Sequence, residues 1–254
     1  MTNSLSANPA NVLVTGASQG IGRAICKEFA RRGHAVLGVS RTKPELHDPN
    51  QSNLFASLTW ASLDLANTDE IGGFASSQAV SSIRTVVLSA VDYGLNGRHS
   101  VSTTLPEEWR RVISTNCIGH CILVSQLLPT LLHNAPGVVI NISSDVAVLP
   151  APGRAAYAAS KAGLHAMVRA VAEEHLGDQL QIYQLIPTFQ LLTAGIRRRR
   201  PAGHDFSSYG DPAIIARVVT RLADREGPSI PAGAYMVQPD GTIEEYGERA
   251  AFPR

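Results

Sequence analysis

The stretch Asn11-Val-Leu-Val-Thr15, followed by Gly16-Ala-Ser-Gln-Gly20-Ile-Gly22, decides the fold. Its first part is a short apolar run typical of a buried β-strand, and a helical pattern continues after the glycines to Arg32. Glycine permits a tight turn and lets the backbone approach a pyrophosphate, which then sits at the positive end of the following helix. The stretch therefore predicts a dinucleotide-binding loop. Its expected contact residues are Gly16, Ser18, Gln19, Gly20, Ile21 and Gly22.

Strands and helices alternate along the rest of the chain. The predicted strands lie near 11–15, 34–40, 58–63, 84–90, 136–143, 179–186 and 233–238, and helical patterns fill most gaps. This alternation is typical of a parallel sheet covered on both faces, whose ligands bind at the carboxyl ends of the strands. We expect one α/β domain over residues 11–254, a doubly wound Rossmann-type fold with about seven strands, after a flexible N-terminus over 1–10.

A second pattern carries candidate chemistry. Tyr157-Ala-Ala-Ser-Lys161 has Ser144 thirteen residues upstream. Residues four apart share a helix face, so the Lys161 ammonium is expected near the Tyr157 phenol, where it would lower a phenol pKa that is ordinarily near 10. Such a tyrosine could exchange a proton with a substrate oxygen at neutral pH, which indicates a carbonyl-reducing or alcohol-oxidising site. The pair is common on ordinary helix faces, and the glycine loop supplies the independent support.

Together, Thr15 with Gly-x-x-x-Gly-x-Gly and Tyr-x-x-x-Lys resemble the short-chain dehydrogenase/reductase family over nearly the whole chain. The resemblance implies that Ser144, Tyr157 and Lys161 are catalytic and that Asn116 is the fourth catalytic residue. It also implies that Tyr157 and Lys161 contact the cofactor, with Lys161 on the nicotinamide ribose. By the same resemblance, Asn116 holds a water that relays protons to Lys161.

The resemblance assigns further positions around the cofactor. It implies that Asp64 and Leu65 lie against the adenine and that Pro187 lies beside the nicotinamide. Residues 188–211, which fit no clear periodicity, correspond to the substrate lid of the family.

Two segments depart from the family pattern. Leu88-Ser-Ala-Val91 stands where the family usually has Asn-Asn-Ala-Gly, and Thr188 replaces a glycine after Pro187. The threonine expected five residues after the proline is Leu192, with Thr193 one place later. Because the first segment acts largely through its backbone, we still expect Ser89 and Ala90 to contact the cofactor. With all four catalytic matches present, we interpret the changes as specialisation.

Ser40 and Arg41 end the second predicted strand and indicate the cofactor. NAD-specific dinucleotide folds tend to place an acidic residue here, whereas an arginine accommodates a 2′-phosphate. No carboxylate occurs in the adjacent Thr42-Lys-Pro44. Ser40 and Arg41 therefore predict NADP(H).

Composition limits the partners and the compartment. Lys plus Arg (22) nearly balances Asp plus Glu (21), so no global field favours nucleic acid. Three cysteines are too few for a disulfide framework. Residues 1–10 carry no signal-peptide pattern, and no uninterrupted apolar run reaches membrane-spanning length. We therefore expect a cytoplasmic protein without a membrane partner.

Three other features have ordinary interpretations. Cys117, His120 and Cys121 have helical spacing, but a zinc site needs three or four converging ligands, so we expect no metal and a satisfied or surface histidine. Asp145 either touches substrate or caps a neighbouring N–H. The run Arg197–Arg200 is usually a solvated face, although its place in the lid leaves an anionic substrate open.

These patterns predict an NADP(H)-dependent oxidoreductase acting on a carbonyl or secondary alcohol of a small molecule. The alternative is a non-catalytic NADP-binding sensor or scaffold, and a sugar-nucleotide epimerase or dehydratase is weaker because the glycine spacing differs. The long helical stretches 107–133 and 153–175 resemble those that join subunits in the family, so we expect a homodimer or homotetramer. Substrate identity depends on variable loops.

Overall fold

The computed structural model describes residues 10–44, 57–94, 100–175, 177 and 179–247. In these residues an eight-stranded sheet has the order β3-β2-β1-β4-β5-β6-β7-β8. Every residue of β1, β2, β4 and β5 is buried, as expected for strands covered on both faces. The strands are β1 (Val12–Thr15), β2 (Val36–Ser40), β3 (Leu58–Ser62), β4 (Thr85–Leu88), β5 (Gly137–Ile142), β6 (Leu180–Pro187), β7 (Gly233–Val237) and β8 (Ile243–Glu245).

Strands β1 to β7 pair in parallel, and β8 pairs antiparallel to β7. From β1 the chain first builds outward to β2 and β3, and then returns to the other side of β1 to begin β4. The loops that leave β1 and β4 therefore diverge, which opens a crevice at the carboxyl ends of these neighbouring strands. The loops after all the parallel strands lie along the same edge and can share one site.

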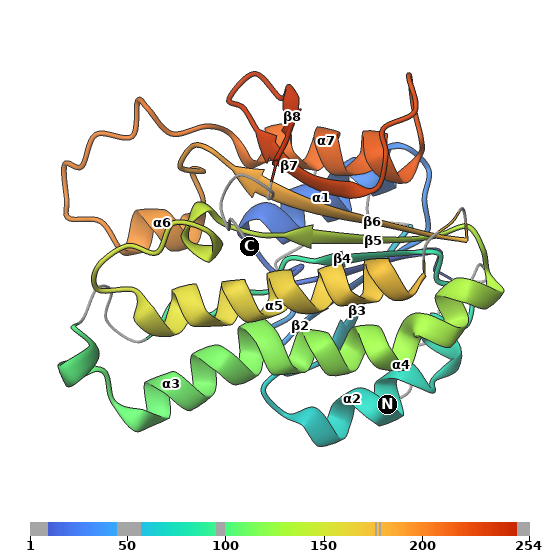
Figure 1. The fold of residues 1–254 in the computed structure, drawn as a ribbon, viewed down its shortest axis with the longest axis horizontal. Helices are drawn as coiled ribbons and strands as arrows, with labels where there is room; N and C mark the ends of the chain where they lie inside the picture. The colour runs from blue at the N-terminus through green and yellow to red at the C-terminus, as the bar shows by residue number, and fades with distance from the viewer. Residues whose placement is uncertain (1–9, 45–56, 95–99, 176, 178, 248–254) are drawn as a thin grey trace.

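Helices cover both faces of the sheet (Figure 1). On one face, α1 (Gly20–Arg31) and α7 (Pro212–Ala223) enclose an apolar core that includes Phe29 and Leu222. The other core packs Leu127 and Leu164 against the sheet. The helices there are α2 (Thr68–Ala75), α4 (Gly119–His133) and α5 (Ala155–Glu174).

The front layer contains one long helix made of α3 (Pro106–Ile113), the π-helical turn η4 (Ser114–Ile118) and α4 (Figure 1). Over Pro106–His133 it is 28 residues long and apolar enough on average to cross a membrane, although the sequence has no uninterrupted apolar run of that length. Its apolar residues Leu123, Leu127 and Leu131 are fully buried. This burial is typical of a core helix.

The remaining elements are short: the 3-10 turns η2 (Gln78–Val80), η3 (Val101–Thr103) and η5 (Asp145–Ala147), and the helix α6 (Ala194–Arg198). Helix α6 lies within the predicted lid, which also forms an isolated bridge between Leu191 and Gly210. The predicted flexible segment 1–10 falls outside the described residues, except for Ala10, which is buried.

All seven predicted strands are present, with ends that differ by no more than two residues. The prediction missed β8. This strand has only three residues, and its two glutamates are exposed, so it carries no apolar pattern. The sequence signal was the dipeptide Asp240-Gly241, a turn pair between β7 and β8, where Gly241 has φ +85°.

We predict that Gly119→Ala destabilises the protein, because a Cβ at Gly119 would overlap the backbone carbonyl of Leu65. Overpacking costs about 1–3 kcal/mol, and each kcal/mol lowers the Tm by about 2–4 °C in a chain of this size. Gly73→Ala in α2 is the control, since nothing lies within 4 Å of an added Cβ, and alanine should raise the Tm slightly. Thermal unfolding of both variants by circular dichroism checks this. A Tm for Gly119→Ala at or above that of the wild type would contradict the close packing.

Candidate active site

The glycine loop after β1 passes against the chain that leaves β4. Gly16 has φ +70°, and a Cβ there would lie 2.7 Å from the Cα of Ala90. A Cβ at Gly22 would overlap the carbonyl oxygen of Gly16. Both positions therefore require glycine, and the loop exposes its backbone to the cleft beside it.

Thr15 fixes the wall opposite the loop. Its hydroxyl oxygen accepts the N–H groups of Ser89 at 2.8 Å and Ala90 at 3.0 Å. The same hydroxyl lies 3.0 Å from Nε2 of His120, whose Nδ1 lies 3.2 Å from the Asn116 carbonyl oxygen. Because a carbonyl can only accept, we assign the His120 proton to Nδ1, which leaves Nε2 as an acceptor. The Thr15 hydroxyl proton is then shared between Nε2 and the Val87 carbonyl, which lies 3.3 Å away.

His120 is fully buried, and this burial, followed by the charge of Lys161, lowers its pKa to about 3. The imidazole is therefore neutral at physiological pH, as the proposed tautomer requires. The prediction of a satisfied histidine is confirmed. No group of three or more potential metal ligands occurs among the described residues.

The half-buried thiols of Cys117 and Cys121 lie 4.0 Å apart, and their contact lowers the pKa of Cys117 to about 7. Burial raises the pKa of the third thiol, Cys26, to about 12.

The cleft continues past the ends of β2 and β3. Ser40 Oγ donates to the Thr42 carbonyl and accepts from the Trp60 indole, both at 2.8 Å. Arg41 is exposed at the cleft wall, and Asp64 accepts the N–H of Ala66 at 3.0 Å. The structure brings together all of the predicted residues from the glycine loop and the ends of β2 to β4. They are Gly16, Ser18, Gln19, Gly20, Ile21, Gly22, Ser40, Arg41, Asp64, Leu65, Ser89 and Ala90.

A larger cavity of about 420 Å³ adjoins this cleft, and Ile21, Tyr93, Thr193 and Arg199 line both. Thr115 Oγ1 is buried next to the cleft without a hydrogen-bond partner among the described residues. A cleft that has the glycine loop at one end and adjoins the larger cavity at the other has room for an extended dinucleotide. The residues present therefore fit a nicotinamide dinucleotide.

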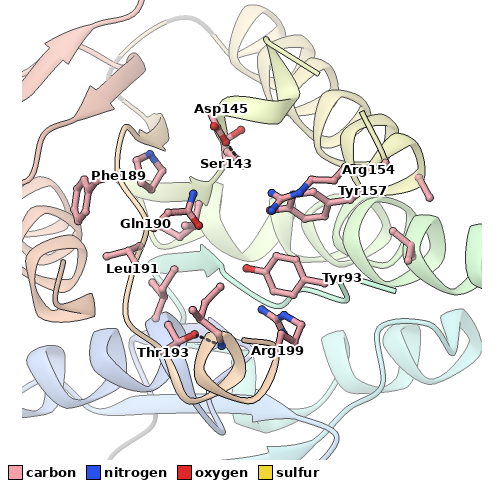
Figure 2. A pocket seen from close by; sticks show the side chains of 18 of the residues that line it. Tyr93, Ser143, Asp145, Arg154, Tyr157, Phe189, Gln190, Leu191, Thr193 and Arg199 are labelled. Atoms are coloured by element: carbon pink, nitrogen blue, oxygen red, sulfur yellow. Dashed lines mark hydrogen bonds between the residues drawn. The ribbon is translucent and has the colours of Figure 1, made fainter. Parts of the chain in front are cut away.

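Ser144, Tyr157 and Pro187 line the larger cavity, as predicted for the catalytic end of the site. Figure 2 shows Tyr157 and Asp145 among the residues that line it. The Ser144 hydroxyl donates to Asp145 Oδ1 at 2.8 Å, and the same oxygen accepts the Val146 N–H at 2.9 Å. Asp145 therefore caps the turn that follows β5, which confirms one of its two interpretations. It also lines the cavity.

The predicted lowering of the Tyr157 pKa is wrong in direction. Burial, followed by the proximity of Tyr93, raises the pKa of Tyr157 well above its ordinary value, despite a hydrogen bond with Ser144. The Lys161 ammonium instead donates to the Ile142 carbonyl at 2.8 Å, and burial lowers its pKa to about 8. The penalty for withdrawing the phenolate from water outweighs the Ser144 hydrogen bond and the charge of Arg154, which both favour the phenolate.

Asn116 lies in the π-helical turn η4 and is fully buried. Its amide group donates to the Asp92 carbonyl at 2.8 Å and to Ser160 Oγ at 3.1 Å, and its Oδ1 accepts the Asp92 N–H at 2.6 Å. The side chain thus fastens the segment after β4 to α5. Asn116 and Lys161 lie behind the cavities rather than in their walls, and the predicted water relay stays a prediction.

Three cavity residues were missed or only partly anticipated. Tyr93 stacks beside Tyr157 with ring centroids 5.1 Å apart, and Arg154 lines the same cavity. Tyr93 comes shortly after the carboxyl end of β4, and that position was the signal for it. Thr193, noted as one place late, lines both cavities and lies against Gly20.

A family model described as short chain dehydrogenase matches residues 10–201. The chain belongs to the short-chain dehydrogenase/reductase family, and it is an NAD(P)-dependent oxidoreductase of that family. Its fold is the mostly parallel Rossmann-like fold of the family.

Two curated relatives match most of the chain. It is 28% identical to carbonyl reductase family member 4 of Danio rerio over 243 residues, which cover 91% of this chain and 97% of the relative. It is 29% identical to 3-oxoacyl-(acyl-carrier-protein) reductase FabG of Rickettsia bellii over 224 residues, covering 84% and 89%. A metagenomic short-chain oxidoreductase solved in complex with NADP has a TM-score of 0.70 and 26% identity, covering 91% of this chain and 97% of that one.

We predict that Lys161→Met raises the free energy of unfolding at pH 7. Burial lowers the pKa of Lys161 in the folded state from 10.5 to about 8. The free-energy cost of burying the protonated amine is therefore at its full size below pH 8, and it falls away as the pH rises to 10.5. The gain should be about 2 kcal/mol at pH 7, after allowing for the lost hydrogen bond to Ile142, and should shrink as the pH rises. Urea unfolding of both proteins at pH 7 and pH 10 measures it. A variant less stable than the wild type at both pH values would show that the buried charge of Lys161 does not destabilise the fold.

Proposed function

We propose that the protein is an NADP(H)-dependent ketone reductase or alcohol dehydrogenase acting on a small molecule. The observation that carries the proposal is the cavity in which Tyr157 and Ser144 meet Pro187 and the glycine-loop residue Ile21. It adjoins a cleft built for a dinucleotide, so the cofactor and a carbonyl group can meet beside the phenol. The names of the carbonyl reductase and 3-oxoacyl reductase relatives support the same class of reaction.

The nicotinamide, when bound, supplies the hydride to the carbonyl carbon or accepts it in the reverse direction. Tyr157 donates its proton to the substrate oxygen, and its raised pKa keeps the phenol protonated and ready to donate at neutral pH. Ser144 orients the same oxygen through its hydroxyl, once the hydrogen bond from that hydroxyl to Asp145 has been broken. Lys161 holds a positive charge behind the site.

The choice of NADP(H) over NAD(H) rests on the end of β2. Arg41 lines the cleft next to Ser40, whose hydroxyl is held by Thr42 and Trp60. Of the described residues lining this cleft, Asp64 alone carries a carboxylate, and it follows β3 rather than β2. An exposed guanidinium at this position suits a 2′-phosphate. The NADP found in the metagenomic relative supports the same choice.

A non-catalytic NADP-binding sensor is the second candidate, because Leu88–Val91 and Thr188 depart from the family pattern. The departures are accommodated: Thr15 holds the backbone of Ser89 and Ala90, and the Thr188 side chain donates to the Val237 carbonyl at 3.1 Å. Self-association and a cytoplasmic location remain predictions.

We predict that Tyr157→Phe lowers kcat/KM by about 10²- to 10⁴-fold, the usual contribution of a positioned general acid. Binding of NADPH, followed by fluorescence titration, should change little, because the phenol contributes little cofactor surface. Tyr93→Phe is the matched comparison, since it removes the other hydroxyl of the stacked pair and should cost less than about 10-fold. If Tyr93→Phe lowered kcat/KM more than Tyr157→Phe, then Tyr93 rather than Tyr157 would be the proton donor.

We also predict that Arg41→Ala weakens NADPH by about 10-fold and changes NADH little. A charge-assisted hydrogen bond is worth about 1.5–3 kcal/mol, and the exposure of Arg41 favours the lower end. Lys43→Ala is the control: it removes a nearby exposed charge that does not line the cleft. Equal losses for the two cofactors, or equal losses in the two variants, would show that Arg41 does not read the 2′-phosphate.

A further inference from the structure

The four arginines Arg197–Arg200 of the predicted lid do not share one environment. Arg197 lies over the Phe206 ring, 5.1 Å from its centroid, and Arg198 donates to the side-chain oxygen of Gln19 at 2.6 Å. Neither of these two lines a cavity that adjoins the catalytic tyrosine. They fit the prediction of a solvated face.

The next two arginines face the substrate cavity. Arg200 donates from Nε to the Tyr209 hydroxyl at 3.1 Å. Arg199 reaches further in: its guanidinium carbon lies 4.2 Å from the centroid of Tyr93, and that ring stacks beside Tyr157 (Figure 2). A positive charge is therefore held one aromatic ring away from the proton donor.

Arg199 has no carboxylate partner within ion-pair distance in the described part of the chain. Although Arg199 is exposed, desolvation lowers the pKa of its guanidinium, assisted by the charges of Arg200 and Arg198 and opposed by Tyr93. The group nevertheless stays charged at physiological pH. Because this guanidinium lines the cavity without a counter-ion in the described part of the chain, an anion bound beside it would be stabilised by a charge-assisted hydrogen bond.

The charged residues that line the cavity also favour an anionic ligand. Its described lining holds the arginines Arg154, Arg199 and Arg200 against the carboxylates Glu108 and Asp145. One carboxylate oxygen of Asp145 is already engaged by the Ser144 hydroxyl and a backbone N–H. The cavity therefore carries an excess of positive charge.

We propose that Arg199 binds an anionic group of the substrate, so that the protein prefers short oxo acids, with the carboxylate a few bonds from the carbonyl, over neutral ketones. This inference rests on the proposed carbonyl chemistry and names its substrate class. The carbonyl oxygen lies at Tyr157 and Ser144, and the carboxylate lies at the Arg199 guanidinium, which itself lies over the Tyr93 ring.

The same cation could meet a different anion, the pyrophosphate of the cofactor, because Arg199 also lines the cofactor cleft. We favour the substrate because the pyrophosphate has the backbone of the glycine loop, at the start of α1, as its binding surface. Arg199→Gln distinguishes the two anions: it would weaken binding of the acidic substrate in the first case and binding of NADPH in the second.

The test compares wild type, Arg199→Gln and the control Arg197→Gln, which removes an equal charge outside both cavities. Binding of pyruvate, acetoacetate and 4-oxopentanoate, and of their ethyl esters, is measured by calorimetry with NADP⁺ bound, where no reduction occurs. Binding of NADPH alone is titrated by fluorescence, and NADPH oxidation by each compound is followed separately.

We expect at least one oxo acid to bind the wild type about 10-fold more tightly than its ester, and Arg199→Gln to lose that difference. Ester and NADPH affinities should stay within about 2-fold, as should every affinity of Arg197→Gln.

No preference for any acid, or equal loss of acid and ester, would overturn the proposal. Weakened NADPH would assign Arg199 to the pyrophosphate instead. The expected binding pattern without NADPH oxidation would contradict the proposed function but leave this inference standing.

Discussion

The close approach of two backbones, at Gly16 after β1 and Ala90 after β4, is the constraint on which the rest of the site depends. These strands are neighbours, and their chains then run to opposite sides of the sheet. A Cβ at Gly16 would come within 2.7 Å of the Ala90 Cα, and the Thr15 hydroxyl accepts the N–H groups of Ser89 and Ala90. The crevice therefore has fixed walls on both sides, and His120 completes the hydrogen bonds of Thr15 from behind.

Burial controls the ionisation of the titratable groups in and behind the site. It raises the pKa of Tyr157, lowers that of Lys161 to about 8 and lowers that of His120 to about 3, so each shift is toward the neutral form. Tyr157 and His120 are neutral at pH 7, whereas Lys161 is still mostly protonated. Positive charge that faces the substrate cavity is instead supplied by arginines, among them the exposed Arg199. A neutral acid and a cation, separated by the Tyr93 ring, are suited to a substrate with a carbonyl at one end and an anion at the other.

The sequence predicted what depends on local pattern. Strands β1 to β7 were visible as apolar runs, and the glycine spacing located the cleft because Gly16 and Gly22 admit no side chain. The rest depends on contacts between distant residues. The direction of the Tyr157 pKa shift comes first from burial of the phenol and then from Tyr93, 64 positions away in the chain. The separate environments of Arg197 and Arg199 follow from how α6 lies on Phe206 and Tyr93, which four consecutive arginines cannot reveal.

The most direct measurement of the central claim is the absorbance of NADPH mixed with the wild-type protein and a panel of ketones and oxo acids. The account predicts a fall in the nicotinamide band that requires both the protein and the carbonyl compound, and a slower fall when NADH replaces NADPH at the same concentration. Tight binding of NADPH with no change in the band across the whole panel would contradict it and would favour a sensor.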